Sequence, residues 1–465
     1  MGITTKEIKF EFKLAESALN FCWTTLTKMH DMLTPHTVPN TTDVINLISF
    51  QDQLATTIFR LQSIRERIII QEKKIIENKR NYNQDWFVKR LRLLSKFKDG
   101  IDKVVNISKS FGDAYAYFFY KFDLELLSNH YSHKRIVNNC AGIGELGELQ
   151  FIKKIKHVNG NFTIFHGITN ILRFGDFSFF DFKTLRIAEI GELKTKKDDG
   201  NKLILSIKML KRPLETDPKR TSLIKDIELQ KTKKGRQLLG IANLLNPVKE
   251  ENSKQASLSN KHYGDSVQEL ISVTKNGMVK TAQVSPGLAF VCVKLNKANL
   301  YNRIFNQKIK QADKMVNDSA EIALKLVKKD SPNNSIILGQ LLYDIDYTDK
   351  NGPGTVPLFW HPIKKDLLKH LYFGECIVMS IFNPTHLVME IEEMGYVVES
   401  KYATRKDYTD NGIRKTLEKF DLFISKIINF LMAESFVVSS LKEIEKIMPT
   451  DKETRSFIHT QQHFN

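Results

Sequence analysis

Cysteine and proline are scarce in this sequence, and both shortages limit what the protein can be. Only 4 of the 465 residues are cysteine and 12 are proline, while 42% are hydrophobic. The cysteines lie far apart, and no two have the C-x-x-C spacing: Cys22, Cys140, Cys292 and Cys376. This pattern predicts neither a disulfide framework nor a zinc site, and it fits the reducing cytoplasm. The apolar share and the few prolines favour a folded, largely helical chain over a disordered one.

Long hydrophobic runs are also missing. The densest apolar run, Ala114–Tyr120, is far shorter than the roughly 18 residues that a membrane span requires. The stretch MGITTKEIKFEFK at the start is charged and lacks the apolar centre of a secretory signal. We therefore expect no membrane segment and a cytoplasmic location.

Negative charge is the third shortage. Lysine and arginine number 70 against 53 aspartates and glutamates, which gives a net charge of +17. This balance favours a polyanionic partner, with nucleic acid ahead of a membrane surface, although an AT-rich genome also enriches lysine. The length exceeds what one hydrophobic core usually supports, so we expect about two or three domains.

The most informative stretch is Gly144–Lys194. It begins with an amphipathic helix whose apolar and acidic residues recur at helical spacing: Leu146, Leu149, Ile152 and Ile155, with Glu145 and Glu148 beside them. Three runs rich in Phe, Ile and Thr follow, and we predict a strand for each of them: Asn161–His166, Phe177–Phe182 and Arg186–Lys194.

Alternation along the third of these strands puts Glu192 and Lys194 on one face, together with Ala188. Asp176 stands just before the second strand. If the two strands form a hairpin that turns at Lys183–Leu185, Asp176 and Glu192 lie at the same open end. Two carboxylates and an ammonium group then meet at one spot.

Such a group of side chains suits metal-assisted chemistry on phosphate. Mg²⁺ prefers hard oxygen ligands and keeps several waters, so two carboxylates on neighbouring strands can hold it. The ion lowers the pKa of a bound water, and a lysine can orient that water. Asp181 is a rival for the first acid, but its parity in the strand puts it on the face opposite Asp176. We interpret Asp181 as a solvated strand residue.

The order of helix acid, Gly-Asp, strand and E-x-K resembles the PD-(D/E)XK nuclease superfamily, whose core runs helix, three strands, helix, strand. The resemblance makes Asp176 the first acid, and it makes Glu192 and Lys194 the E-x-K pair. Glu148 matches the helix acid that many members add. Gly175 stands where the name of the family has proline.

The resemblance covers roughly residues 140–295 and implies further roles. It implies Mg²⁺ or Mn²⁺ as the cofactor, with the backbone carbonyl of Leu193 as an additional ligand. It makes Asp226–Leu245 the second core helix, with Gln230 next to the metal, and Gly287–Leu295 the strand that completes the core.

Basic residues surround the expected site. Arg173 precedes the Gly-Asp step, where a guanidinium fork suits phosphate, and His166 is more plausible as an ordinary strand-end residue than as a phosphate contact. We expect a strand at Lys202–Met209. We place six basic residues beside the nucleic-acid backbone, or alternatively in a solvated insertion: Lys196, Lys197, Lys211, Arg212, Lys219 and Arg220. Asn246–His262 has the composition of a flexible linker.

The first 135 residues are expected to form a helical domain. A stripe at helical spacing begins near Asp43 and contains Leu54, Ile58, Leu61, Ile64, Ile68 and Ile75. Two more helical runs follow, Asp85–Lys98 and Gly100–Ser128. A helical bundle is favoured over a coiled-coil arm for self-association. One stretch mixes aromatic and basic residues and fits either burial or a nucleic-acid contact: Trp86, Phe87, Lys89, Arg90 and Arg92.

Residues 296–465 are expected to form an α/β region that ends in one long helix, Gly412–Met448. Asp344 and Asp346 share a strand face there and could bind metal, but a solvated strand end is favoured. The helical regions could also join two copies of the chain into a homo-oligomer.

The expected fold class is therefore α+β (α/β): a helical N-terminal domain, a restriction-endonuclease-like αβββαβ core, and an appended α/β region. The expected function is metal-dependent cleavage of nucleic acid, with DNA favoured. Family analogy suggests restriction or anti-phage defence. A nucleic-acid-binding or partner-regulated module without cleavage is the alternative, and a helical scaffold for protein assembly is a third.

Overall fold

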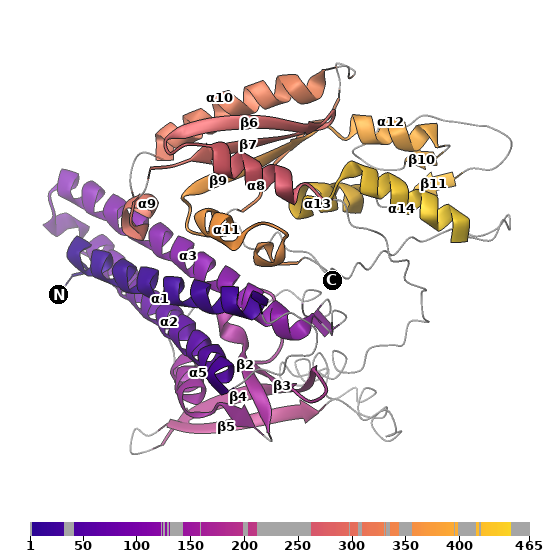
Figure 1. The fold of residues 1–465 in the computed structure, drawn as a ribbon. Helices are drawn as coiled ribbons and strands as arrows, with labels where there is room; N and C mark the ends of the chain where they lie inside the picture. The colour runs from indigo at the N-terminus through magenta and orange to yellow at the C-terminus, as the bar shows by residue number, and fades with distance from the viewer. Residues whose placement is uncertain are drawn as a thin grey trace. The chain divides into compact units, whose positions relative to one another are not determined.

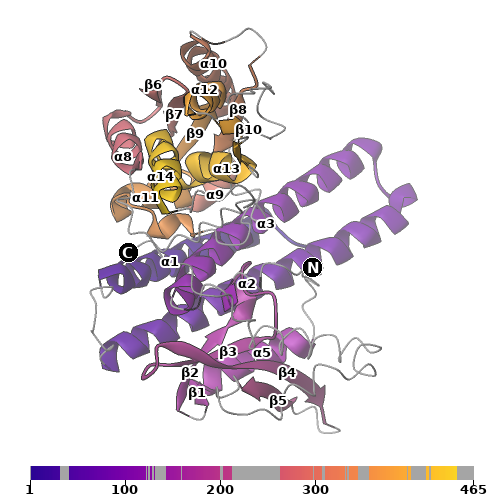
Figure 2. The ribbon, with the colours of Figure 1, turned by 90° about the vertical axis from the view of Figure 1, so that its right-hand side faces the viewer.

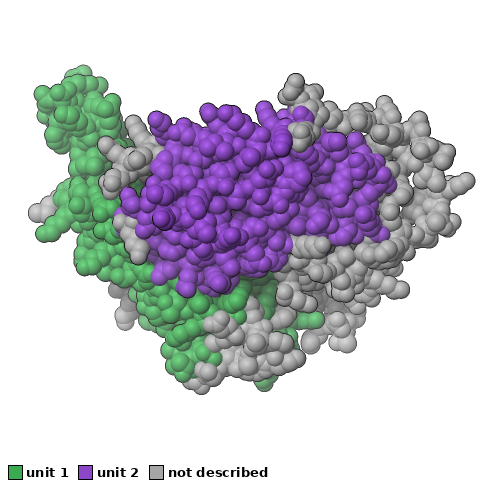
Figure 3. Space-filling view, turned by 45° about the horizontal axis from the view of Figure 1, so that its top comes forward, with its two compact units in different colours: residues 1–250, 299–305, 345–360 green, residues 251–298, 306–344, 361–465 purple. Residues whose placement is uncertain are grey.

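The computed structural model describes residues 2–31, 41–121, 123, 126–127, 130, 143–158, 160–198, 203–211, 262–296, 298–305, 309–329, 331, 335–343, 356–394, 396–398, 415–417 and 420–447. The protein is a mixed α+β chain that divides into two compact units (Figures 1 and 3). The first unit comprises residues 1–250, 299–305 and 345–360, and the second comprises residues 251–298, 306–344 and 361–465.

Three long helices dominate the first unit: α1 (Thr5–Asp31), α2 (Thr41–Glu77) and α3 (Gln84–Tyr120). They pack against one another, and α2 and α3 run side by side over most of their length (Figure 2). The predicted apolar stripe on α2 is confirmed, because every one of its members is buried: Leu54, Ile58, Leu61, Ile64, Ile68 and Ile75. The helical bundle expected from the sequence is therefore present.

Helix α3 is continuous where the sequence suggested two separate helices. The presumed break, Gly100, lies inside the helix, and a Cβ there would come within 2.2 Å of Phe305 Cζ. The glycine makes room for α9 (Leu300–Phe305), which packs against α1 and α3. At the N-terminus, Asn83 Oδ1 accepts hydrogen bonds from the backbone N–H groups of Asp85 and Trp86, at 2.9 and 3.4 Å. It is thus a standard N-cap.

A five-stranded antiparallel sheet accompanies these helices. Its strands follow chain order: β1 (His157–Val158), β2 (Asn161–Phe165), β3 (Phe177–Asp181), β4 (Arg186–Lys197) and β5 (Leu203–Lys211). Helix α5 (Ile143–Lys154) precedes them, and the short 3-10 turn η2 (His166–Ile168) follows β2. The four predicted strands and the preceding helix are confirmed. Enrichment in Phe, Ile and Thr identified the first three of these strands correctly.

Helices cover both faces of this sheet. Phe151 on α5 contacts Phe177, with ring centroids 4.4 Å apart. Phe119 on α3 contacts Phe162 and Phe180, at 5.5 and 5.1 Å. Phe177 and Phe180 are three residues apart in β3 and therefore point to opposite faces. The sheet is thus sandwiched between α5 and the end of α3.

The second unit contains its own antiparallel sheet, in the order β6-β7-β9-β8. Its strands are β6 (Met278–Ser285), β7 (Leu288–Lys294), β8 (Leu338–Leu341) and β9 (Cys376–Phe382). Its helices are α8 (Gly264–Val273), α10 (Ile309–Lys328), α11 (Lys365–Tyr372), α12 (Thr385–Glu393), α13 (Phe420–Phe430) and α14 (Glu434–Ile447). The two short strands β10 (Tyr396–Val398) and β11 (Lys415–Leu417) pair in parallel.

The strand predicted to complete the nuclease core, Gly287–Leu295, belongs to this second sheet. Strand β7 pairs with β6 and β9 and not with any strand of β1–β5, so that prediction is wrong. An apolar run predicts a strand buried on both faces, but it carries no information about which sheet receives it.

The long terminal helix predicted at Gly412–Met448 is also wrong as a single element. Helices α13 and α14 are separated at Leu431, whose φ is +57°. Tyr263 N–H donates to Leu431 O at 2.6 Å, and His262 forms a bridge with Met432. These long-range backbone hydrogen bonds replace helical ones, and apolar periodicity cannot reveal them. Among the described residues, no helix is long and apolar enough to cross a lipid bilayer.

Candidate active site

The turn before β3 presents Asp176. The residue before Asp176 is Gly175, whose backbone φ is +65°. Residues other than glycine rarely adopt this conformation. A Cβ at this position would lie 2.7 Å from Ile190 Cγ2 and 2.9 Å from Gly191 O. Proline, fixed near φ −65°, cannot take this conformation. Glycine is therefore required by this turn.

Two hydrogen bonds attach Asp176 to strand β4. Its backbone N–H donates to Gly191 O at 2.8 Å, and its Oδ2 accepts from Leu193 N–H at 2.7 Å. These contacts lie on either side of Glu192. The hairpin predicted from the sequence is confirmed, because β3 and β4 pair with Phe177 opposite Gly191. Asp176 and Glu192 consequently stand at the same end of that hairpin.

The carboxylate of Glu192 is not fully satisfied by hydrogen bonds from the described residues. Its Oε2 is buried from solvent and has no hydrogen-bond partner in the part of the chain that the structure describes. A buried carboxylate oxygen without a partner is costly, and a hard cation is the natural group to satisfy it. Carboxylate oxygens such as those of Asp176 and Glu192 are of the ligand type that Mg²⁺ and Mn²⁺ prefer.

Glu148 comes from the helix on the other face of the sheet. Its neighbour Gly147 packs so tightly that a Cβ would lie 1.8 Å from Thr195 Oγ1. Alternation puts Glu192 and Lys194 on the face opposite Thr195. Among the described residues, no three His, Cys, Asp or Glu side chains are close enough to hold a metal ion together. Glu148 as a third ligand stays a prediction.

Lys194 is half-buried on β4 and pairs across the sheet with Ser206. It shares a face with Glu192 by alternation. Sequence reasoning missed Lys208, which lies directly opposite Glu192 on β5 and adds a second ammonium group to that face. The antiparallel pairing of β4 with β5 brings it there, and no local motif marks it.

The other predicted basic residues have mixed outcomes. Lys196 and Lys197 are exposed at the end of β4. Arg173 is half-buried, and its Nε donates to Asn170 O at 3.4 Å. Several predictions lie outside the described residues: Gln230, Arg212, Lys219, Arg220, Asp344, Asp346, the helix 226–245 and the linker 246–261. Lys211 ends β5, and its side chain is not among those described.

A β-bulge interrupts the alternation on which part of the site was predicted. Phe179 pairs with Glu189 and Phe180 pairs with Ile187, which leaves Ala188 as the extra residue. The face predicted for Ala188 therefore cannot be read from simple alternation, whereas Glu192 and Lys194 lie beyond the bulge and keep theirs.

Asp181 closes the other end of the hairpin. Its Oδ1 accepts from Lys183 N–H at 2.8 Å, and its Oδ2 accepts from the Thr184 hydroxyl at 2.9 Å. Leu185 completes the turn with φ +55°. The predicted turn at residues 183–185 is confirmed, and Asp181 stabilises that turn at the end of the hairpin away from Asp176.

Behind the Asp176 turn lies a chain of buried polar side chains. Tyr120 OH lies 2.5 Å from Ser178 Oγ, and Ser178 Oγ lies 2.5 Å from His166 Nε2. His166 Nδ1 lies 3.1 Å from Gly175 O. All three side chains are fully buried. Burial raises the pKa of Tyr120 above its ordinary value, so its hydroxyl keeps its proton.

A second buried histidine continues this chain. His130 Nε2 lies 3.4 Å from Tyr120 OH, and Phe174 N–H donates to His130 Nδ1 at 3.3 Å. Sequence reasoning interpreted His166 as a strand-end residue and missed the other three side chains. Their positions in the sequence are widely separated, so no local pattern could have grouped them.

Asp113 on α3 anchors the loop that leads to the turn. Its carboxylate accepts from the backbone N–H groups of Asn170 and Ile171, at 2.6 and 3.1 Å, and from Asn170 Nδ2 at 3.1 Å. Burial outweighs these hydrogen bonds and raises its pKa to about 6.

The site as a whole is a turn tied to α3 by buried polar groups, with two acids and Lys194 at the open end of the β3–β4 hairpin and Lys208 on the neighbouring strand β5. No known protein family, curated protein or solved structure matches this chain.

Proposed function

We propose that the protein is a metal-dependent nuclease that hydrolyses phosphodiester bonds of nucleic acid, with DNA favoured. One observation carries the proposal. Asp176 is hydrogen bonded to β4 on both sides of Glu192, whose Oε2 is buried and lacks a hydrogen-bond partner among the described residues. Lys194 follows on the same face. Two oxygen ligands beside an ammonium group suit hydrolysis at phosphate.

Each residue then has a distinct task. Asp176 and Glu192 hold Mg²⁺ or Mn²⁺, together with the carbonyl of Leu193. When bound, the ion supplies an acidified water and offsets charge on the phosphate. Lys194 orients the attacking water and stabilises the charge that develops on the phosphate oxygens, where a half-buried position strengthens its effect.

The charge of the chain supports a nucleic-acid substrate. The net charge is +17, and Lys196 and Lys197 are exposed four and five residues beyond Glu192 on the same strand. At about 3.3 Å per residue they lie roughly 13–17 Å from that acid. Lys196 shares the face of Glu192 by alternation, and its distance suits contact with a phosphate that flanks a bond cut at the site.

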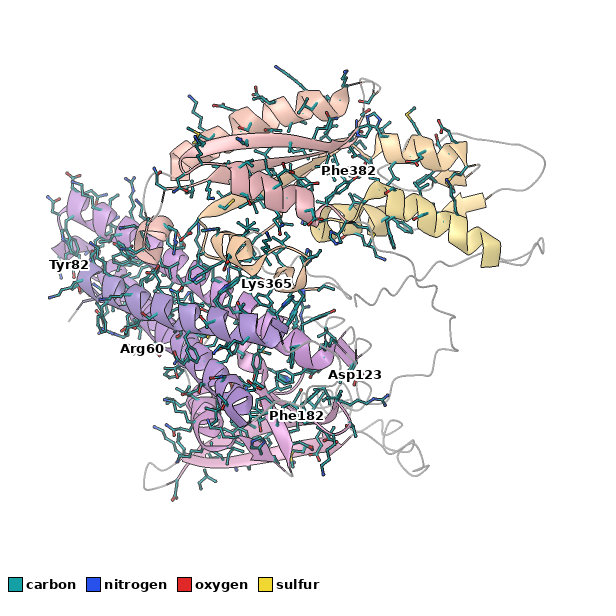
Figure 4. The ribbon with its side chains drawn as sticks, in the orientation of Figure 1. Arg60, Tyr82, Asp123, Phe182, Lys365 and Phe382 are labelled. Atoms are coloured by element: carbon teal, nitrogen blue, oxygen red, sulfur yellow. The ribbon has the colours of Figure 1, made fainter. Side chains whose placement is uncertain are left out.

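The far end of the α2–α3 pair supports the same substrate. Tyr82 and Trp86 are 37% and 45% exposed and stack on each other, with ring centroids 4.6 Å apart. Figure 4 shows Tyr82 at the end of the helices that is remote from the sheet. Lys79 and Arg80 are exposed beside the pair, whereas Phe87 is buried. Exposed aromatics among basic residues suit stacking with bases.

The distance between the two surfaces suggests a substrate length. Gln51 on α2 donates to Thr163 O in the sheet at 2.8 Å, and α2 ends at Glu77. The intervening helix spans about 40 Å at 1.5 Å per residue. A duplex as long as this helix segment has about 12 base pairs, which is the substrate length that we propose for contact with both surfaces.

The experiment is a digestion assay with purified protein, Mg²⁺ or Mn²⁺, and single- and double-stranded DNA and RNA. Asp176→Ala and Glu192→Ala should each abolish metal-dependent cleavage, because each removes a ligand and not a core side chain. Asp181→Ala is the matched control and should stay active. The proposal fails if the wild-type protein shows no metal-dependent digestion, or if Asp181→Ala abolishes cleavage while Asp176→Ala does not.

A binding module without cleavage is the second candidate. It is favoured by the finding that no three metal-ligating side chains among the described residues come together. It predicts salt-dependent nucleic-acid binding that Asp176→Ala leaves unchanged, and no digestion with any divalent metal.

A further inference from the structure

We propose that Tyr120, Ser178, His166 and His130 form a continuous hydrogen-bond circuit that positions Asp176 for metal binding. This inference rests on the proposed function. The four side chains come from the end of α3, from β3, from η2 and from the chain after α3, and all are fully buried. They touch neither the metal nor the substrate, so they are positioning residues.

The direction of the first bonds follows from their acceptor. Gly175 O can only accept, so His166 Nδ1 must carry the hydrogen of the 3.1 Å contact. In a neutral ring, which burial favours, Nε2 is then a bare acceptor. The Ser178 hydroxyl therefore donates to His166 Nε2, and its oxygen accepts from Tyr120 OH.

The other end is fixed by its donor. Phe174 N–H can only donate, so His130 Nδ1 is the acceptor and Nε2 carries the hydrogen. That hydrogen points to the Tyr120 oxygen, which is free to accept because its own hydrogen goes to Ser178. All the hydrogen bonds can thus be donated in one direction, from the Phe174 N–H group, through four side chains, to the Gly175 carbonyl.

The circuit affects the site because its two ends are backbone groups next to Asp176. Phe174 and Gly175 are the two residues immediately before Asp176. In addition, the His166 backbone N–H donates to Asp176 O at 3.0 Å. The circuit therefore holds the N–H group of Phe174 and the carbonyl of Gly175, whose φ is +65°. It thereby fixes the backbone position from which the Asp176 side chain extends. Outer groups that orient metal ligands typically change metal affinity by about 10–100-fold.

A nucleophilic role for the Ser178–His166 pair is the competing interpretation. Its geometry, with serine on one ring nitrogen and a carbonyl on the other, resembles a hydrolase dyad. Both side chains are 0% exposed, and Tyr120 from α3 covers the serine, so no substrate can reach that oxygen. The pair is placed to orient the turn and not to attack a substrate.

The test compares two buried tyrosines of the same helix. Tyr120→Phe removes a hydroxyl of the circuit, whereas Tyr115→Phe removes one that donates to Leu47 O at 3.1 Å, outside the circuit. Each should cost similar stability in denaturant unfolding. Mn²⁺ affinity, measured by calorimetry on the intact protein, should fall about 10–100-fold for Tyr120→Phe only. Ser178→Ala should behave like Tyr120→Phe.

A second measurement separates this inference from the proposed function. Nitrogen-15 NMR of the metal-free protein should show His166 protonated at Nδ1 and His130 protonated at Nε2. The opposite tautomer at either ring overturns the circuit, as does an equal loss of Mn²⁺ affinity in the two tyrosine variants. If the tautomers are as expected but the wild-type protein binds no Mn²⁺, the proposed function fails, and the positioning role fails with it.

Discussion

The two sheets of this protein differ in what their central strands bury. In the second unit, β7 buries six successive apolar or small residues, Leu288–Val293, and packs against α10. In the first unit, β4 buries Ile187 and Ile190, but also Glu189 and one oxygen of Glu192. Burying acids opposes folding, so a strand selected for packing alone avoids it. The departure from an apolar pattern therefore distinguishes the sheet in which we propose the active site.

The largest expected effect tests the second sheet as a purely structural one. Phe290 on β7 is 1% exposed, and Phe290→Ala should cost about 3–5 kcal/mol of unfolding free energy through the cavity that it leaves. Denaturant unfolding measures this loss. Mn²⁺ affinity of the protein that remains folded should not change. A matching loss of affinity would show that the two sheets do not have separate roles.

The next effect belongs to the first sheet. Lys194→Ala should lower the cleavage rate about 10²–10³-fold while it leaves Mn²⁺ affinity intact, because it removes one preorganised charge and no ligand. Single-turnover cleavage and calorimetry measure the two quantities. Lys183→Ala, in the exposed hairpin turn, is the control and should cleave normally. Full activity of Lys194→Ala would remove this lysine from the mechanism.

A pair of glycines in the first unit separates backbone strain from crowding. Gly175 and Gly160 both have positive φ, +65° and +81°, but a Cβ at Gly160 meets nothing within 4 Å. Gly160→Ala should cost about 1–2 kcal/mol, the cost of a left-handed residue. Gly175→Ala should cost about 2–4 kcal/mol, because crowding against Ile190 is added, and it should also weaken Mn²⁺ binding. Equal effects in both assays would contradict the tight fit of the turn.

The smallest effect concerns the surface. Replacing Lys196 and Lys197 together by Gln should weaken DNA binding and reduce its log–log salt slope by roughly 0.7–0.9 for each lysine that binds a phosphate in the wild-type complex. Replacing Lys325 and Lys328, which are exposed on α10, makes the same change of charge in the second unit and should leave the slope unaltered. The same slope in both double variants would show that Lys196 and Lys197 lie at a solvated strand end and do not bind phosphate.

The sequence predicted the local parts of the candidate site well. The β3–β4 hairpin, its turn at Lys183–Leu185 and the closeness of Asp176 to Glu192 follow from alternation over a few residues. Each of these features depends on contacts between neighbours in the chain, which residue patterns encode directly.

The features that the sequence failed to predict depend on contacts between residues that are distant in the chain. The sheet that receives β7, the break at Leu431 and the tyrosine–serine–histidine circuit all depend on partners far away in the chain. Gly100 resembled a helix break but accommodates Phe305, which is about two hundred residues away. Periodicity specifies which face of an element is buried, and it does not specify the partner that buries it.

The central claim is that Asp176 and Glu192 share one divalent ion, and a Mn²⁺-soaked crystal tests it most directly. The account predicts an anomalous peak bonded to both carboxylates, on the face of the sheet that also presents Lys194. In crystals of Glu192→Gln, the same soak should give no peak there. A peak that persists in that variant, or a Mn²⁺ ion bound only elsewhere in the wild-type protein, would contradict the account.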